Sequence, residues 1–489
     1  MSIHSLRRLP EADRRPPARS RPSTSAAKST SKHAWARTTA AIRTPSTPPG
    51  STPRPGRTTI SRSDGHAPSH DPRSTTMLTA ACLAITALAL NPEPDPDNGG
   101  LTLPEGFGAV VVHEGVGPAR HIAVRENGDL YVALRRNRGG GIVCIRDEDG
   151  DFKADRVEKF GQVQGTGIAI RDNWLYFGGD FQIGRFELPE DSLTPVGDFE
   201  RIVFGFVQEG QHAAKPIDFG ADGKLYVNCG APSNACQQLS RTPGSPGMDP
   251  CPLLEYCGGI WVYDPDTKDQ EHPADGERFA TGLRHCVAID EHDGAIYTVM
   301  HGRDQLDTLF SEHFDNAQNA ELPAEEMHRL TQGSDAGWPY TYWDGMKDER
   351  MVAPEYGGDG EQVSDNNDFQ DPIQTFPAHW APNAIMIYEG EQFPERYRGG
   401  AFVAFHGSWN RAPFPQAGYK VTFTPMDEGE VTADYEVFAD GFAGSPEIRS
   451  PRDAEYRPMG LATAPDGSIY ISDSIKGKIW RVFWIGDDE

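Results

Sequence analysis

The sequence predicts an all-β fold, a six-bladed β-propeller, and two observations support that prediction. First, a short motif recurs, in which a turn leads into alternating apolar residues that end in an aromatic residue. Its copies are Gly128–Tyr131, Asn173–Tyr176, Gly223–Tyr226, Gly294–Tyr297 and Gly467–Tyr470, with a degenerate sixth at Gly400–Phe405. Second, helical periodicity is weak, and the 489 residues include 52 Gly and 40 Pro, which suits a turn-rich sheet protein.

Each copy of the motif is typical of a hairpin turn that enters an inner strand. From Tyr131 through Tyr176, Tyr226, Tyr297 and Phe402 to Tyr470, the intervals are 45, 50, 71, 105 and 68 residues. A blade of four short strands takes roughly 40–50 residues, so the longer intervals indicate loop insertions. We expect these insertions at about 231–258 and 303–395, on one rim, where loops either build a site or only cap the assembly. The propeller is predicted to span 101–486.

The first 76 residues are predicted to be a disordered, basic extension rich in Ser, Thr, Pro and Arg. The apolar run at 77–90 is too short to span a bilayer and contains the small-residue pattern Ala87-Leu88-Ala89. It therefore predicts a signal peptide, followed by a linker at 91–100. Two interpretations of the extension stay open: translation starts at Met77, or a basic arm precedes the signal. Either way we expect export to the periplasm or the extracellular space, without stable membrane insertion.

The body of the chain is strongly acidic. The net charge is −26, and residues 1–76 hold 14 basic and 4 acidic side chains, so the remainder carries about −36. Such a surface repels phosphate backbones, which excludes nucleic acid as a partner of the main domain.

The cysteines beyond the apolar run predict disulfide staples whose pairing the spacing leaves open. No Cys-x-x-Cys pair occurs, which excludes a thiol-redox centre, a zinc ribbon and a covalently attached haem. The six residues are Cys144, Cys229, Cys236, Cys251, Cys257 and Cys286.

Cationic side chains stand at equivalent places in several predicted blades. His212 lies just upstream of one inner-strand motif, Arg284 and His285 precede the next, and Arg457 precedes the last. Taken one at a time, such residues are more often structural. Their repetition around one axis instead predicts a ring of positive charge, and therefore an anionic ligand at its centre.

A separate cation site is predicted in an acidic loop. Asp147, Asp149, Asp151 and Asp155 alternate around a glycine turn, a pattern that can wrap calcium. The alternative is a solvated acidic turn between two strands, because the loop lacks the bidentate Glu of a full helix-loop-helix site.

Several segments resemble the quinoprotein glucose/sorbosone dehydrogenases, the soluble PQQ-dependent sugar dehydrogenases with a six-bladed propeller. The resemblance spans about 101–485, and His406-Gly-Ser-Trp-Asn-Arg411 is its most specific motif, pointing to the L-sorbosone dehydrogenase-like branch. The other matching segments are His212…Asp222-Gly-Lys-Leu-Tyr226, Gly282-Leu-Arg284, His301-Gly-Arg-Asp-Gln-Leu306, Glu326…Gly337-Trp-Pro-Tyr340 and Tyr456-Arg-Pro-Met-Gly-Leu461.

The resemblance implies a role for each matching residue. His212 would be the general base that takes a hydroxyl proton, and Arg284 would stabilise charge on the reducing cofactor. The backbone carbonyls of Gly302 and Arg303 would hold a calcium ion that PQQ also ligates. The implied cofactor-binding residues are Arg120, Arg284, His285, His406, Trp409, Arg411 and Arg457.

Three departures from the family pattern concern cofactor contacts. His285 stands where the best-known glucose-oxidising members have an asparagine, and Met459 replaces a second arginine of the last blade. The family's fifth-blade lysine has no clear counterpart, so His406 or Arg411 would have to substitute. These changes weaken the case for glucose as substrate more than the case for PQQ.

The function predicted from the sequence is a secreted PQQ- and calcium-dependent dehydrogenase. Its substrate would be an aldose, a sugar aldehyde or a related alcohol, and its electrons would leave to an external acceptor, either a cytochrome or a quinone. Two alternatives stay open: a calcium-dependent lactonase on a propeller, and a non-catalytic carbohydrate-binding propeller.

Overall fold

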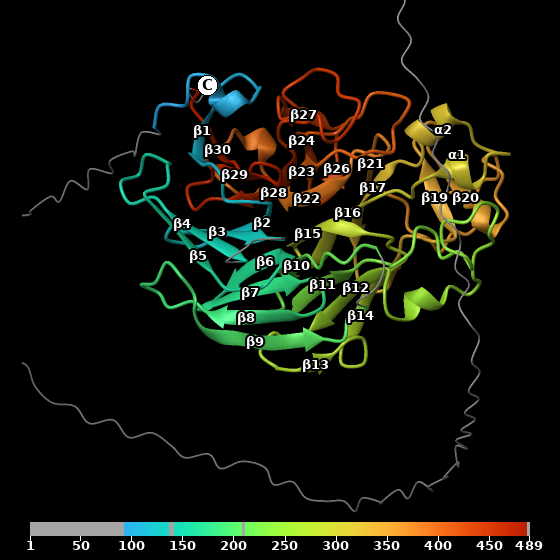
Figure 1. The fold of residues 1–489 in the computed structure, drawn as a ribbon, viewed down its shortest axis with the longest axis horizontal. Helices are drawn as coiled ribbons and strands as arrows, with labels where there is room; N and C mark the ends of the chain where they lie inside the picture. Colours follow the sequence, from blue (N-terminus) through green and yellow to red (C-terminus); the bar gives the residue numbers. More distant parts are fainter. Residues whose placement is uncertain (1–91, 136–140, 208–210, 487–489) are drawn as a thin grey trace, which may run out of the picture. The chain divides into compact units, whose positions relative to one another are not determined.

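The computed structural model describes residues 92–135, 141–207 and 211–486. The predicted basic extension and signal peptide lie outside the described residues. Within them, six sheets of four or five strands surround one axis, so the predicted six-bladed propeller is confirmed (Figure 1).

Blades 1 to 3 follow one another along the chain. Blade 1 comprises β2 (Ala119–Val124), β3 (Leu130–Leu134), β4 (Ile142–Arg146) and β5 (Arg156–Phe160). Blade 2 comprises β6 (Gly165–Arg171), β7 (Trp174–Gly179), β8 (Ile183–Glu187) and β9 (Val196–Phe204), with β13 (Gln270–Glu271) added in parallel. Blade 3 comprises β10 (Ile217–Phe219), β11 (Leu225–Cys229), β12 (Gly259–Tyr263) and β14 (Glu277–Thr281), with β18 (Ser334–Asp335) added in parallel.

Blades 4 to 6 complete the ring. Blade 4 comprises β15 (Cys286–His292), β16 (Ala295–Met300), β17 (Glu325–Leu330) and β21 (Gln374–Phe376). Blade 5 comprises β22 (Pro382–Ile387), β23 (Ala401–Phe405), β24 (Lys420–Thr424) and β27 (Glu436–Ala439). Blade 6 comprises β28 (Pro458–Thr463), β29 (Ile469–Asp473), β30 (Ile479–Trp484) and β1 (Phe107–His113).

The first strands of the blades form the wall around the axis. Each contacts the first strand of the next blade, and Figure 1 shows β2, β6, β10, β15, β22 and β28 gathered around the middle. The motif aromatics lie one strand further out, in the second strand of each blade, where they are buried in the cores. This position explains the motif, because the side chain must fill the interface between neighbouring sheets.

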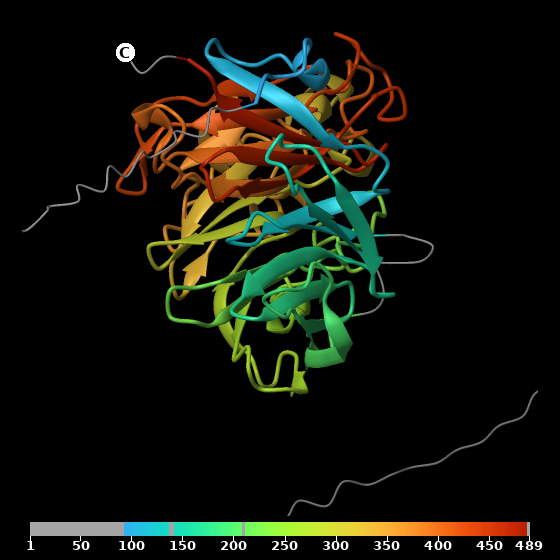
Figure 2. The same ribbon diagram turned by 90° about the vertical axis from the view of Figure 1, so that its left-hand side faces the viewer.

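Blade 6 is built from both ends of the described chain. Strand β1 pairs antiparallel with β30, from Phe107 opposite Trp484 to His113 opposite Ile479, and Figure 2 shows blue β1 beside the red strands. Part of the predicted linker belongs to this blade. The side chains of Asp95 and Asn98 accept hydrogen bonds from the backbone N–H groups of β1. The 91–100 segment is therefore not a linker throughout, because its side chains accept hydrogen bonds from backbone N–H groups on the outer edge of β1.

The insertions differ from the prediction at 303–395. That range is not one loop, because β17, β21 and β22 lie inside it. The sequence of β17, Glu325–Leu330, carries charged side chains that are nonetheless buried, which hid its strand pattern. The inserted segments hold α1 (Leu306–Leu309), α2 (Asn316–Glu321), β19 (Thr341–Asp344), β20 (Glu349–Val352) and η3 (Pro354–Tyr356). The remaining short elements are η1 (Asn98–Gly100), η2 (Pro252–Glu255), η4 (Glu395–Tyr397), β25 (Met426–Asp427) and β26 (Glu430–Val431).

Only part of the predicted disulfide framework is present among the described residues. Cys236 and Cys251 form a disulfide that closes the predicted 231–258 insertion. Cys144 and Cys286 are free and buried, so they fill cores instead of stapling loops, and burial raises the pKa of Cys286 to about 12. Cys229 and Cys257 are also free, with their sulfur atoms 3.6 Å apart.

No helix in the described parts of the chain combines the length and the apolar character needed to cross a membrane.

Candidate active site

One end of the propeller axis holds a polar cavity of about 340 Å³. Its wall is rich in histidine and arginine and comes from blades 1, 3, 4 and 5 and the segments that join them. The polar and aromatic lining residues are Arg120, Arg135, His212, Arg284, His285, His301, Asp304, Glu325, His379, Asn383, His406, Ser408 and Trp409.

The strand register explains why these residues meet. In every blade except blade 3 the residue at the start of the first strand pairs with the residue at the end of the second, for example Cys286 with Met300 and Pro382 with Phe405. The residue just before the first strand and the residue just after the second strand therefore reach the same end of the axis. In blade 4 these residues are His285 and His301, and in blade 5 the second of them is His406.

His212 is held in a geometry suited to a base. Its Nδ1 lies 2.6 Å from the carbonyl oxygen of Ala231, so Nδ1 carries the proton that is donated and Nε2 is left as an acceptor. Its backbone has a φ of 64°, a left-handed conformation that a non-glycine residue keeps only when its surroundings impose it. The ring stacks on His285 with centroids 4.3 Å apart. Burial, helped by the nearby Arg284 charge, holds the pKa of His212 well below 6.5, so the imidazole is neutral at pH 7.

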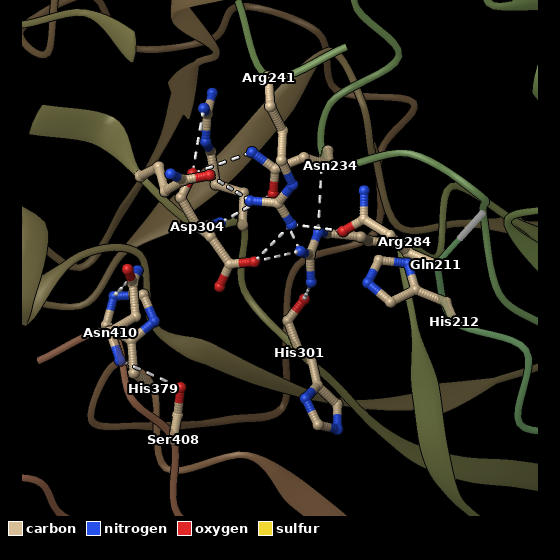
Figure 3. A network of polar contacts seen from close by, with 12 residues as sticks. Gln211, His212, Asn234, Arg241, Arg284, His301, Asp304, His379, Ser408 and Asn410 are labelled. Atoms are coloured by element: carbon tan, nitrogen blue, oxygen red, sulfur yellow. Dashed lines mark hydrogen bonds and ion pairs between the residues drawn. The ribbon is translucent and has the colours of Figure 1, made fainter. Parts of the chain in front are cut away.

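Arg284 lies in a buried polar network behind His212. Its guanidinium donates to the backbone and side-chain oxygens of Asn234 and to Asp304, at 2.9 to 3.1 Å. Figure 3 shows dashed lines from the Asp304 carboxylate to both Arg284 and Arg241, and the Arg241 guanidinium lies 2.9 Å away. Burial alone would raise the pKa of Asp304, but the two arginines outweigh it and hold that pKa at about 2. The carboxylate is therefore ionised, and it fixes the direction of Arg284.

The other imidazoles of the cavity are also neutral. Burial, reinforced by neighbouring cationic and imidazole groups, holds the pKa of His285 and of His406 well below the usual value. His406 has its Nε2 2.7 Å from the Ser474 hydroxyl, whereas Nδ1 of His285 is buried without a hydrogen-bond partner among the described residues. A buried unpaired ring nitrogen costs stability unless a ligand or water completes it, so His285 is available for a bound polar group.

Oxygen atoms gather on one side of the cavity around Gly302. Neither the carbonyl oxygen of Gly302 nor that of Arg303 accepts a hydrogen bond from any described residue. Below them, the carboxylate of Glu325 accepts from the N–H groups of Gly302 and Ala381, at 2.8 and 2.9 Å. Burial raises the pKa of Glu325 to about 7, although these two hydrogen bonds oppose the shift. The free carbonyl of Gly302 in the cavity wall, next to a second free carbonyl at Arg303, is the kind of oxygen ligand that a hard cation takes.

Two of the predicted cofactor-binding arginines do not line the cavity. Arg457 directs its guanidinium to the carbonyl oxygens of His406 and Gly407, which positions the loop that carries His406. Arg411 pairs with Glu321 at 2.6 Å and donates to two backbone carbonyls outside the cavity. The guanidinium groups of both residues already bind loop carbonyls or a carboxylate. A match to a sequence motif does not reveal such partners.

The remaining predicted residues are placed as follows. Arg120, His285, His406, Trp409 and Gly302 line the cavity together with His212 and Arg284, and Trp409 is 55% exposed. The Arg303 side chain turns away and binds the buried carboxylate of Glu355. Met459 does not line the cavity but is buried behind two apolar residues of its wall, Ala214 and Val287, and receives a hydrogen bond from Asn383.

The acidic loop brings three of its four predicted ligands together. Carboxylate oxygens of Asp147, Asp149 and Asp151 lie within 4.8 Å of one another. Asp155 instead accepts from the N–H of Glu148 at 2.7 Å. A cation at this loop stays a prediction.

Sequence reasoning missed several residues of the cavity. His301 and Asp304 lie inside a motif that the family resemblance had already marked, so that motif was the available signal. Glu325, His379 and Asn383 had no signal of their own. Glu325 lies in the hidden strand β17, His379 in the segment between β21 and β22, and Asn383 in β22, which was predicted to be part of an insertion.

The neutral histidines predict how stability depends on pH. Burial lowers the pKa of His121 to about 4, and the pKa of His285 and His406 also lies below the value of about 6.5 expected for an unfolded chain. Between pH 6.5 and 4 the unfolded chain thus binds more protons, and the free energy of unfolding should decrease as the pH falls. Glu325, whose pKa is raised, acts oppositely, since its contribution is lost as the pH rises from 4.5 to 7. Urea unfolding across this range measures the slope. A flat profile would contradict the prediction, and His121→Asn should reduce the slope.

Comparison with known proteins identifies relatives of the whole propeller. A family model described as TrAA12-like matches residues 101–484. A pyrroloquinoline quinone-dependent pyranose dehydrogenase of Coprinopsis cinerea is 26% identical over 284 residues, covering 49% of this chain and 36% of that protein. The chain spans about half or less of the length of the curated relatives that it matches. The match covers 49% of one relative and 36% of the pyranose dehydrogenase.

Two solved structures show the same fold. The holo form of the pyranose dehydrogenase PQQ domain from Coprinopsis cinerea has a TM-score of 0.60 at 19% identity, covering 78% of this chain and 97% of that chain. The calcium structure of a Trichoderma reesei family AA12 enzyme has a TM-score of 0.64 at 18% identity, covering 81% and 99%. At this identity the likeness establishes the propeller and its blade order alone.

Proposed function

The chain belongs to the TrAA12-like family, and on that premise we propose that it is an exported quinoprotein that oxidises a sugar. The observation that carries the proposal is a cavity in which a neutral histidine faces an ordered guanidinium beside free backbone carbonyls. The finer assignments are an aldose, sugar aldehyde or related alcohol as substrate, PQQ and calcium as cofactors, and a cytochrome or quinone as electron acceptor.

The cavity wall suits an anionic, planar cofactor such as PQQ. Arg120 and Arg135 provide positive charge on one side, and Arg120 is fixed by a 3.1 Å hydrogen bond to Thr166. Trp409 offers an exposed ring at the mouth, and His285 offers a buried ring nitrogen without a partner. PQQ, when bound, would supply a quinone, an acceptor for the hydride on the hydroxyl-bearing carbon of the substrate.

Calcium would be held by the carbonyl oxygens of Gly302 and Arg303. Their freedom from hydrogen bonds and their place beside Glu325 fit a hard cation with oxygen ligands. The ion would polarise the oxygen that it touches and would draw negative charge toward this side of the cavity.

The protein's own residues then divide the remaining work. Nε2 of His212 takes the hydroxyl proton of the substrate, because Nδ1 is already committed to Ala231. Removing that proton makes the substrate oxygen a stronger electron donor at the moment hydride leaves. Arg284, oriented by Asp304 and Asn234, presents a fixed positive charge to the negative charge that develops opposite it.

The lactonase alternative has less support. It needs carboxylates and an asparagine that converge on a metal, but the carboxylates of this cavity are already engaged. Asp304 is bound by Arg284 and Arg241, and Glu325 by two backbone N–H groups. Calcium-dependent lactone hydrolysis would also leave the arginines and histidines of the cavity wall unexplained.

Cofactor titration tests the proposal. We expect purified protein to take up one PQQ with calcium present, with a shift of the quinone absorbance, and to lose that absorbance when a sugar is added. After chelation, PQQ should give no shift until calcium is restored. Equal PQQ binding in chelator would refute the metal-bridged site. No uptake under either condition would refute the quinoprotein assignment.

A further inference from the structure

A second, larger hollow lies along blade 2 and the end of blade 1, and one end of it reaches the same end of the propeller axis as the cavity. Its volume is about 780 Å³, within the range of roughly 300–1,000 Å³ that ligand sites occupy. Gln164 directly precedes β6 and Asp180 directly follows β7, and Gly165 pairs with Gly179. These are the positions that His285 and His301 hold in blade 4, so the strand register places Gln164 and Asp180 at the same end of the axis.

A charged residue of the hollow, Asp180, is close enough to the cavity residue Arg120 to affect its pKa. Burial and the Arg135 charge lower the pKa of Arg120 to about 9, whereas the charge of Asp180 opposes that shift. Arg120 also bonds to Thr166, two residues beyond Gln164. The inner end of the hollow therefore lies within reach of a residue that lines the cavity.

The chemistry of the hollow differs sharply from that of the cavity. None of its described lining residues is Lys, Arg or His, and its charged members are Asp180 and Asp198. Its floor is a rigid aromatic cluster, in which Phe186 packs edge-on against Phe160 at 4.9 Å and tilts against Phe199 at 5.2 Å. At the rim, Phe181 is 44% exposed.

Polar side chains of the hollow are free to bind a ligand. The amides of Gln162, Gln164 and Gln182 form no hydrogen bond with any described residue. One carboxylate oxygen of Asp180 is buried without a partner among the described residues. Aromatic faces beside free amides and carboxylates match a ligand that is apolar on its C–H faces and carries hydroxyls at its edges.

We propose that this hollow binds the further sugar units of a neutral oligosaccharide whose terminal sugar enters the cavity. The inference rests on the proposed function and narrows its substrate class. Neutral chains are favoured over acidic ones, because the described lining residues include two carboxylates and no cationic side chain. Phe181 stacks on a sugar ring, and Gln164 and Asp180 bind hydroxyl groups where the chain leaves the cavity.

The test compares sugars of different length on matched variants. Glucose and xylose are assayed beside cellotriose, maltotriose and xylotriose, with wild type, Phe181→Ala, Gln164→Ala and Ile485→Ala. Ile485 is a control because it is 47% exposed and is absent from the linings of both the hollow and the cavity. We expect the ratio of kcat/KM for trisaccharide over monosaccharide to fall about three- to tenfold in Phe181→Ala and Gln164→Ala. An unchanged ratio in both variants overturns the proposal.

Binding without turnover separates this inference from the proposed function. Calorimetry with protein free of cofactor measures trisaccharide binding directly. Binding that is weakened in Phe181→Ala and kept in Ile485→Ala supports the hollow as a glycan site even if no sugar is oxidised. Absence of trisaccharide binding to wild type, for every trisaccharide tested, overturns it.

Discussion

Replacing His212 with alanine is expected to lower the rate of cofactor reduction by about two to four orders of magnitude, the usual contribution of a positioned general base. The reason is geometric, because Ala231 holds the ring with Nε2 free. PQQ affinity should change little, since the charged and oxygen ligands of the cavity hold the cofactor. Single-turnover reduction in PQQ-loaded, folded protein is the measurement, with melting temperature followed in parallel.

His313→Ala provides the control, because His313 is an exposed histidine outside the cavity. The lowered pKa of His212 adds a second expectation. The acidic limb of kcat/KM should lie well below pH 6.5 and should disappear in His212→Ala. Near-normal reduction by folded His212→Ala would show that another group takes the proton.

Replacing Arg284 with alanine should weaken PQQ binding at least tenfold and also lower the free energy of unfolding by about 1–3 kcal/mol. Arg284 is only 3% exposed, and its loss leaves the carbonyl oxygen of His301 without its donor. The two oxygens of Asn234 lose one donor each but keep Trp338 Nε1 and the backbone N–H of Asp304. Asp304 would keep Arg241 as a partner, which limits the loss of stability. PQQ titration and urea unfolding measure the two effects.

The Arg284→Lys variant separates the effect of the positive charge from the effect of the guanidinium hydrogen bonds. Lysine keeps the positive charge but cannot reproduce the guanidinium fork that contacts Asn234 and Asp304 at once, so we expect an intermediate affinity. Arg449→Ala is the matched control, since Arg449 forms an exposed ion pair with Glu447. Wild-type PQQ affinity in Arg284→Ala would remove this side chain from the proposed site.

The sequence was sufficient for the blades because their repeat is a local pattern. A turn, alternating apolar residues and a buried aromatic identify the second strand of each sheet, and the register of neighbouring strands follows from it. It was insufficient for β17, whose Glu326 and His328 are polar residue types that are nonetheless buried. Pairing of β1 with β30 joins residues more than 360 positions apart, and no local pattern reports such a contact.

The sequence could predict which residues lie at the cavity end of the axis, because that depends only on their position relative to the strands of a blade. His212, Arg284 and His406 precede or follow predicted strands, so their place at one end of the axis could be deduced. What each side chain touches could not be deduced. The guanidinium of Arg457 donates hydrogen bonds to loop carbonyls, and that of Arg411 pairs with Glu321. Both residues nevertheless match the family motif as well as Arg284 does.

Strand β1 is the outermost strand of a blade whose other three strands are synthesised after those of blades 1 to 5. A growing chain can therefore assemble its early blades in sequence but leaves β1 unpaired until β30 is available. Joining these strands closes a loop of several hundred residues, a slow step because distant segments must meet. Once joined, they act as a clasp, since opening the ring requires the ladder between Phe107 and Trp484 to break. The clasp makes the blade 6 seam the place where resistance to mechanical pulling at either terminus should be concentrated.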